Sequence, residues 1–187
     1  MCIRDRSYEE HLSTYDALPT KKKLKLLSLK KGLPEELHKN IAKKKAQETI
    51  DVLFEVIKPR GEFTKIFEKL HKDGYKIAIA SNAVRSTVET SIDCLEIRKF
   101  INTIYSNEDV ERPKPHFEMF FKIMLELNSK PEETLILEDS HIGRQAVLES
   151  GCHLLPIIDT HDVTLRKIDS KITELNKNTS SNVSWRS

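Results

Sequence analysis

Apolar and polar residues follow two different patterns in the two parts of the chain. In the first part, leucines and isoleucines recur at three- and four-residue spacing among lysines, which predicts amphipathic helices over residues 20–31 and from Pro34 to about Ile57. Gly32 is expected to end the first helix, since glycine commonly follows a helix terminus. Residues 8–57 are therefore expected to be entirely helical.

Behind Pro59 and Gly61, short apolar runs alternate with helical patterns. The runs are typical of buried strands, and helical spacing fills the segments between them. The predicted strands are 75–81, 103–106, 134–138 and 153–157, and the predicted helices lie over 63–70, 84–92, 117–127 and 142–147. Strand and helix units of this length favour an α/β fold class, a Rossmann-like parallel sheet core with a small α-helical domain in front of it.

These patterns divide the chain into four segments. Residues 7–58 form the predicted helical domain, residues 59–166 the α/β core, and the polar residues 167–187 a flexible tail. Residues 1–6, Met-Cys-Ile-Arg-Asp-Arg, have neither the apolar stretch of a signal peptide nor an amphipathic period. We interpret these six residues as a non-native junction.

Composition excludes several classes of protein. With 38% hydrophobic and 32% charged residues among 187, and no apolar run of about 20 residues, the chain is expected to be globular and not to span a membrane. The formal charge of +2 and the lack of aromatics among the lysines argue against nucleic-acid binding. Three cysteines without a CxxC spacing imply neither a disulfide framework nor a zinc site, so a cytoplasmic location is expected.

Polar residues follow three of the predicted strands, where a parallel sheet binds its ligands. Ser81 and Asn82 could hold a phosphoryl oxygen or could simply cap the next helix. Lys114, between two prolines, could aim a charge at a phosphate or could be a solvated loop lysine. Glu138 and Asp139 are adjacent carboxylates that suit Mg²⁺, with helix capping by Asp139 as the alternative.

In this order and spacing, these motifs resemble the second, third and fourth motifs of the haloacid dehalogenase superfamily, in the branch of β-phosphoglucomutase and phosphoglycolate phosphatase. The resemblance covers roughly residues 8–165. It implies that Ser81 and Lys114 are catalytic contacts of the phosphoryl group, with Asn82 beside them. It also implies that Glu138 and Asp139 bind Mg²⁺.

The first motif of that superfamily, D-x-D-x-[T/V], supplies the aspartate nucleophile and is not found in this sequence. Asp16-Ala-Leu-Pro-Thr20 has part of the spacing, but a leucine occupies the second carboxylate position and a turn is the simpler interpretation. The resemblance then implies that the first core strand is missing and that the chain is truncated at its N-terminus. Thr20 and Lys21, in the helical cap, would help to choose the substrate.

The resemblance implies a Mg²⁺-dependent phosphatase that acts on a small phosphorylated metabolite through an aspartyl-phosphate, with this chain itself inactive. Residues 1–58 carry 13 Lys and Arg against 9 Asp and Glu, which suits a phosphorylated substrate, although a solvated basic face explains the same lysines. A sugar phosphomutase and a non-catalytic phosphate-binding relative remain the alternatives.

Overall fold

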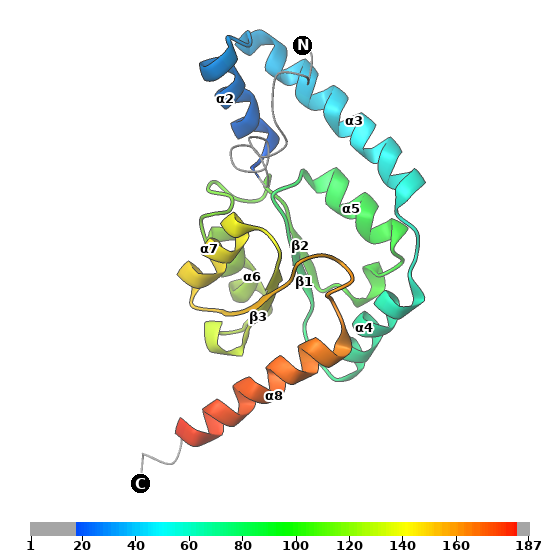
Figure 1. Cartoon of the computed structure of the whole chain (residues 1–187), viewed down its shortest axis with the longest axis vertical. Coiled ribbons are helices and arrows are strands. Elements are labelled where there is room, and N and C mark those ends of the chain that lie inside the picture. The colour runs from blue at the N-terminus through cyan, green and yellow to red at the C-terminus, as the bar shows by residue number, and fades with distance from the viewer. Residues whose placement is uncertain (1–17, 183–187) are drawn as a thin grey trace.

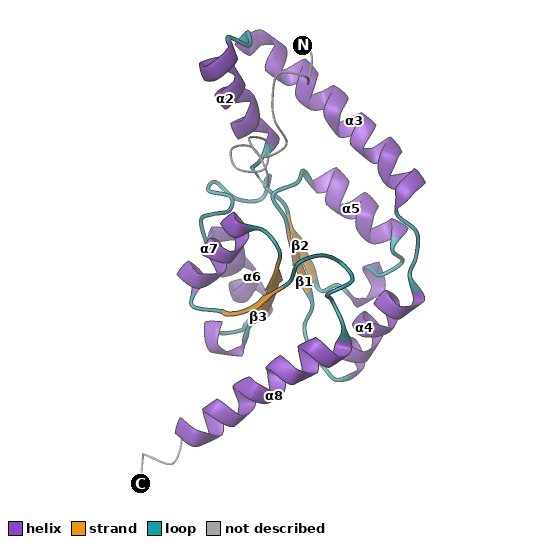
Figure 2. Ribbon diagram, viewed as in Figure 1, coloured by secondary structure: helices purple, strands orange, loops and turns teal. Residues whose placement is uncertain are grey.

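The computed structural model describes residues 18–182, with side chains described up to residue 177. The predicted junction at 1–6 and the turn residue Asp16 lie outside these residues. Helices flank short parallel strands, and a pair of helices stands at one end of the molecule (Figure 1). Figure 2 shows the same arrangement by element type. The elements in chain order are α2 (Thr20–Lys31), α3 (His38–Val56), α4 (Gly61–Lys72), β1 (Ala78–Ala80), α5 (Arg85–Cys94), β2 (Thr103–Tyr105), α6 (Glu118–Leu127), β3 (Leu135–Glu138), α7 (His141–Ser150), β4 (His153–Pro156) and α8 (Leu165–Asn182).

The two N-terminal helices form a hairpin. α2 ends where predicted, because Gly32 adopts a left-handed φ of 68° and its N–H closes the last turn on Ser28. A 3-10 turn over Glu35–Leu37 precedes α3, which lies beside α5. The predicted apolar face of α3 is wrong in part: the helix has no buried residue, and Ile41 and Phe54 are exposed.

The strands form two parallel ladders in the part of the chain that the structure describes. β1 pairs with β2, from Ala78 opposite Thr103, and β3 pairs with β4, from Leu135 opposite His153. β1 and β3 do not pair with each other within residues 18–182. The parallel α/β core is thus confirmed, while the strand expected to be missing between them stays a prediction.

Helices cover both faces of the β3–β4 ladder. On one face Phe120 of α6 and Val147 of α7 belong to one buried cluster. On the other face Ile66 of α4 and Ile168 of α8 pack against Leu155 of β4. This layering buries both faces of the strands and leaves their carboxyl ends toward the α2–α3 hairpin.

The prediction of a flexible tail from residue 167 is wrong for residues 167–182, which belong to α8. Leu165, Ile168 and Ile172 recur at three- and four-residue spacing and join the cluster around Ile66. This apolar stripe anchors a helix whose average composition is polar. Among the described helices, none combines the length and apolar character needed to cross a bilayer.

Candidate functional site

A cavity of about 590 Å³ lies between the α2–α3 hairpin and the carboxyl ends of the strands. Ser81, which follows β1, and Asp139, which follows β3, line it together with Lys114 from the loop behind β2. The three positions that the sequence singled out therefore meet in one place, because the carboxyl ends of β1 and β3 both lie at this cavity.

Lys114 is the buried cation of this cavity. Its Nζ lies 2.7 Å from Glu138 Oε2 and 3.1 Å from the Ala80 carbonyl, and the residue is 7% exposed. The Phe120 ring lies below the ammonium group, 5.3 Å from Nζ to the ring centroid. Lys114 is thus a fixed charge at the floor of the cavity rather than a solvated loop lysine.

Glu138 is almost fully committed to contacts within the protein. Its Oε1 accepts hydrogen bonds from the backbone N–H and the hydroxyl of Ser140, at 3.0 and 2.7 Å, while Oε2 faces Lys114. Burial raises the pKa of Glu138, but the charge of Lys114 and the hydrogen bonds from Lys114 and Ser140 lower that pKa below its ordinary value. The cation that offsets the Glu138 carboxylate is therefore Lys114.

Asp139 differs from its neighbour because its side chain is exposed at the wall of the cavity. It does not cap α7. Ser140 does so, with its hydroxyl accepting a hydrogen bond from the Gly143 N–H at 3.0 Å. Asp139 is thus placed to contact whatever enters the cavity.

The described residues do not complete a magnesium site. Asp139 offers oxygens to the cavity, but both oxygens of Glu138 are engaged. Within residues 18–177, no cluster of three or more His, Cys, Asp or Glu side chains could hold a metal ion. Oxygen ligands for Mg²⁺ would have to come in part from elsewhere.

Ser81 and Asn82 have different roles in the structure. Ser81 Oγ accepts a hydrogen bond from the Ala83 N–H at 3.1 Å, and its own O–H can still donate into the cavity. The side-chain amide of Asn82 instead holds the backbone of Lys114: Oδ1 accepts from Lys114 N–H at 3.1 Å and Nδ2 donates to Lys114 O at 3.0 Å. Both ends of this amide thus position Lys114, and phosphate binding by Asn82 stays a prediction.

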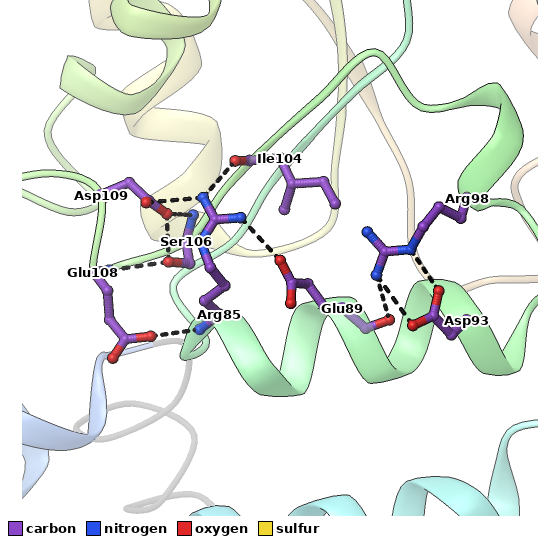
Figure 3. Close-up of polar contacts among 8 residues, drawn as sticks. All are labelled: Arg85, Glu89, Asp93, Arg98, Ile104, Ser106, Glu108 and Asp109. Carbon is purple, nitrogen blue, oxygen red and sulfur yellow. Dashed lines mark hydrogen bonds and ion pairs between the residues drawn. The ribbon is translucent and has the colours of Figure 1, made fainter.

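The loop that carries Lys114 is tied to α5 by charged groups (Figure 3). Arg85 Nη2 lies 2.8 Å from Asp109 Oδ1, and Asp109 Oδ2 accepts from the Ser106 N–H at 2.7 Å. Arg85 Nη1 also pairs with Glu89, and the Arg85 backbone N–H donates to Glu108. Burial raises the pKa of Asp109, but hydrogen bonds from Ser106 and Arg85 lower it below its ordinary value. These contacts fix the start of the loop.

The hairpin contributes the opposite wall of the cavity. Thr20 lines it as predicted, whereas Lys21 does not and is exposed. One turn along α2, Lys23 faces the cavity, and from α3 the Lys45 Nζ donates to Thr20 Oγ1 at 3.2 Å. Residues three apart share a helix face and adjacent residues do not, so Lys23 rather than Lys21 accompanies Thr20.

The sequence analysis did not predict that α3 forms part of this wall, although the residue pattern of the helix indicates it. On α3 the small or polar residues Ala42, Lys45, Ala46 and Thr49 occur at the spacing of one helix face, and all four line the cavity. This spacing, and not an apolar stripe, marks the face of α3 that lines the cavity.

A sequence profile for the family described as haloacid dehalogenase-like hydrolase matches residues 6–157. Among curated proteins, the pyrophosphatase PpaX of Bacillus mycoides (strain KBAB4) is 37% identical over 83 residues, which is 43% of this chain and 39% of that protein. PpaX from Bacillus cereus (strain Q1) is 35% identical over 83 residues, 43% of this chain and 38% of that protein. The matched segment thus spans well under half of these relatives.

Solved structures show the same fold at low sequence identity. β-Phosphoglucomutase from Clostridium difficile superposes with a TM-score of 0.74 at 17% identity, over 91% of this chain and 83% of that one. CbbY from Rhodobacter sphaeroides, solved in complex with phosphate, gives 0.71 at 19% identity, over 85% of this chain and 75% of that one. The likeness extends over both the hairpin and the strands.

Proposed function

Because the chain belongs to the haloacid dehalogenase-like hydrolase family, we propose that it forms the cap and most of the core of an enzyme that hydrolyses a small phosphorylated metabolite. In this proposal the α2–α3 hairpin is the cap and residues 59–166 are the core. The observation that carries it is the convergence of Ser81, Lys114 and Asp139 in one cavity under the hairpin.

Each of these side chains has a proposed task at the phosphoryl group. The Ser81 hydroxyl donates a hydrogen bond to a phosphoryl oxygen, and the fixed Lys114 ammonium offsets negative charge beside it. Such a site acts mainly by positioning and electrostatic stabilisation of a loose transition state. Asp139 and Glu138 remain the proposed contribution to Mg²⁺ binding, which requires further oxygen donors outside the described residues.

The nucleophile is proposed to lie outside residues 18–182. Within the cavity the described carboxylates are Glu138, which is paired with Lys114, and Asp139. In the intact enzyme an aspartate oxygen would form a bond to phosphorus as the P–O bond to the leaving group breaks. The leaving group is an alcohol from a phosphomonoester or the second phosphate from pyrophosphate. Water would then release phosphate from the aspartyl-phosphate. Because the sequence has no D-x-D-x-[T/V] motif, the chain is proposed to bind phosphate without turnover.

The cap wall favours a substrate with a second anionic group. Lys23 and Lys45 line the cavity from the hairpin, opposite Lys114 on the core side. Two lysines that face a third suit a substrate such as pyrophosphate, the class of substrate implied by the name of the PpaX relatives.

Titration calorimetry of the full chain with inorganic phosphate and with pyrophosphate tests the proposal. We expect binding that Lys114→Ala and Ser81→Ala each weaken by roughly tenfold or more, the size expected for a lost hydrogen bond to a charged group. Lys21→Ala, which removes an exposed lysine of the same hairpin, is the control and should leave the affinity unchanged. Binding that is insensitive to Lys114→Ala would refute the assigned site.

Turnover measurements test whether the nucleophile is missing, and the upstream DNA sequence separates the enzyme from a non-catalytic relative. We expect no Mg²⁺-dependent hydrolysis of pyrophosphate or p-nitrophenyl phosphate by this chain, so hydrolysis that disappears in Asp139→Asn would contradict the missing nucleophile. Sequencing the source DNA upstream of the Ser7 codon decides the parent protein: a strand ending in D-x-D-x-T supports the enzyme. An upstream strand without these aspartates supports the non-catalytic relative. A phosphomutase would return the phosphoryl group to a sugar instead of water.

A further inference from the structure

The third residue of α7 is a glycine that lies directly against the carboxylate of Glu138. A Cβ built on Gly143 would fall 2.0 Å from Glu138 Cδ and 2.3 Å from each of its carboxylate oxygens. These are the three nearest atoms to that position, and all three belong to Glu138. Glycine is also less favourable than alanine inside a helix. The carboxylate of Glu138 is thus the group that requires a hydrogen at this position.

We propose that Gly143 is a positioning residue that allows the Glu138 carboxylate to lie against the first turn of α7 and there to hold Lys114. This inference deepens the proposed function, on which it rests for the assignment of Lys114 to the phosphoryl group.

The contacts of Glu138 show what a methyl group at position 143 would do. Two hydrogen bonds to Oε1 come from Ser140, the residue that begins α7, and the ammonium of Lys114 lies 2.7 Å from Oε2. A Cβ 2.0 Å from Cδ is well inside the 3.0 Å below which such contacts essentially never occur. The carboxylate is the mobile end of its side chain, so it would move by about 1 Å or more while the helix backbone stays in place.

Such a movement would separate the carboxylate from its partners. Lys114 would lose the anion that fixes its ammonium, although the Asn82 amide would still hold its backbone. The effect of Gly143→Ala would therefore reach Lys114 through Glu138 and not through the fold of α7.

Gly143→Ala and Gly61→Ala form a matched pair for the experiment. Gly61 also lies in the first turn of a helix, and a Cβ there meets no atom within 4 Å. The side-chain ammonium resonance of Lys114, whose Nζ lies 2.7 Å from Glu138 Oε2, is followed by ¹⁵N NMR at pH 7 in ligand-free full-length chain. We expect this resonance to move toward that of an exposed lysine in Gly143→Ala and to keep its position in Gly61→Ala. An unchanged Lys114 resonance in Gly143→Ala would overturn the proposal.

A second measurement, the urea midpoint of unfolding, tests the proposal even if Gly143→Ala is less stable than the wild type. The urea midpoint should fall in Gly143→Ala, whereas the same substitution in a Glu138→Ala background should not lower it, because the clashing carboxylate is gone. An equal loss in both backgrounds would show that Gly143 serves the helix and not Glu138. Both measurements use no phosphate, so a failure of wild-type chain to bind phosphate would refute the proposed function alone.

Discussion

Removing the charge of Lys114 while keeping its length, as in Lys114→Met, should be among the most destabilising single changes in the core. The side chains of Lys114 and Glu138 are 9% and 7% exposed, with Nζ and Oε2 2.7 Å apart. At an effective dielectric constant of about 20, two unit charges at this separation attract by roughly 6 kcal/mol before the cost of removing both from water. Deleting one partner of a buried pair typically costs about 3–5 kcal/mol, because the other charge is left without compensation. The two hydrogen bonds from Ser140 remain, so we expect about 3 kcal/mol.

The pH dependence of the stability provides a second, independent test of this prediction. In the wild type the pKa of Glu138 is lowered, so its contribution to stability is fully present above the pKa of the unfolded chain and is lost as pH falls through the folded value. In Lys114→Met, burial is no longer offset by the ammonium and should raise that pKa. The stability difference between the two proteins should therefore be larger at pH 7 than at pH 4.

Urea denaturation followed by circular dichroism at these two pH values measures both effects. Lys171→Met is the matched control, since Lys171 and Glu174 are also 2.8 Å apart but their side chains are 25% and 57% exposed. Exposed pairs contribute about 0–1 kcal/mol, so this variant should remain close to wild type. A cost below about 1 kcal/mol for Lys114→Met, or an equal cost at both pH values, would refute the description of a buried ion pair.

Three further outcomes are expected. Ile168→Ala should lower the free energy of unfolding, measured by urea denaturation, by about 2–4 kcal/mol because Ile168 is 4% exposed. Ile158 is 83% exposed, so Ile158→Ala should change this free energy by less than about 0.5 kcal/mol. Equal effects of the two substitutions would contradict the packing of α8. Burial raises the pKa of Glu118, but hydrogen bonds from two backbone N–H groups and a lysine lower it to about 2. Glu118→Gln should thus destabilise above about pH 4.5 and progressively less toward pH 2, as acid titration by circular dichroism would show. Lys45→Ala should weaken pyrophosphate binding more than phosphate binding in calorimetry, while Lys21→Ala changes neither.

The strands and their carboxyl ends could be predicted from the sequence because buried parallel strands are short, apolar runs. Each of the four predicted strands overlaps an observed one. Ser81, Lys114 and Asp139 lie behind such runs, and the carboxyl ends of the strands lie at one cavity. The contacts of Asn82 and Glu138 with Lys114 complete this arrangement.

The roles of individual side chains could not be predicted, because they depend on contacts far apart in the chain. Asn82 holds the backbone of Lys114, 32 positions away, and nothing in its neighbours distinguishes this from phosphate binding. Glu138 and Asp139 are adjacent in sequence but have opposite environments, since consecutive residues at a strand end point in different directions. The apolar stripe of α8 was not predicted, because the average composition of the segment is polar although Ile168 and its neighbours are apolar.

Arg85 has a consequence for self-association as well as for the loop. Its Nη2 donates to the carbonyl of Ile104, the central residue of β2, at 3.0 Å. Among the described strands, β2 pairs only with β1, so its outer side is an open edge of the kind that recruits strands from other molecules. An incoming strand would have to displace a guanidinium that is also held by Asp109 and Glu89. Arg85 therefore covers a backbone acceptor at this open edge, and its ion pairs hold both that cover and the start of the Lys114 loop.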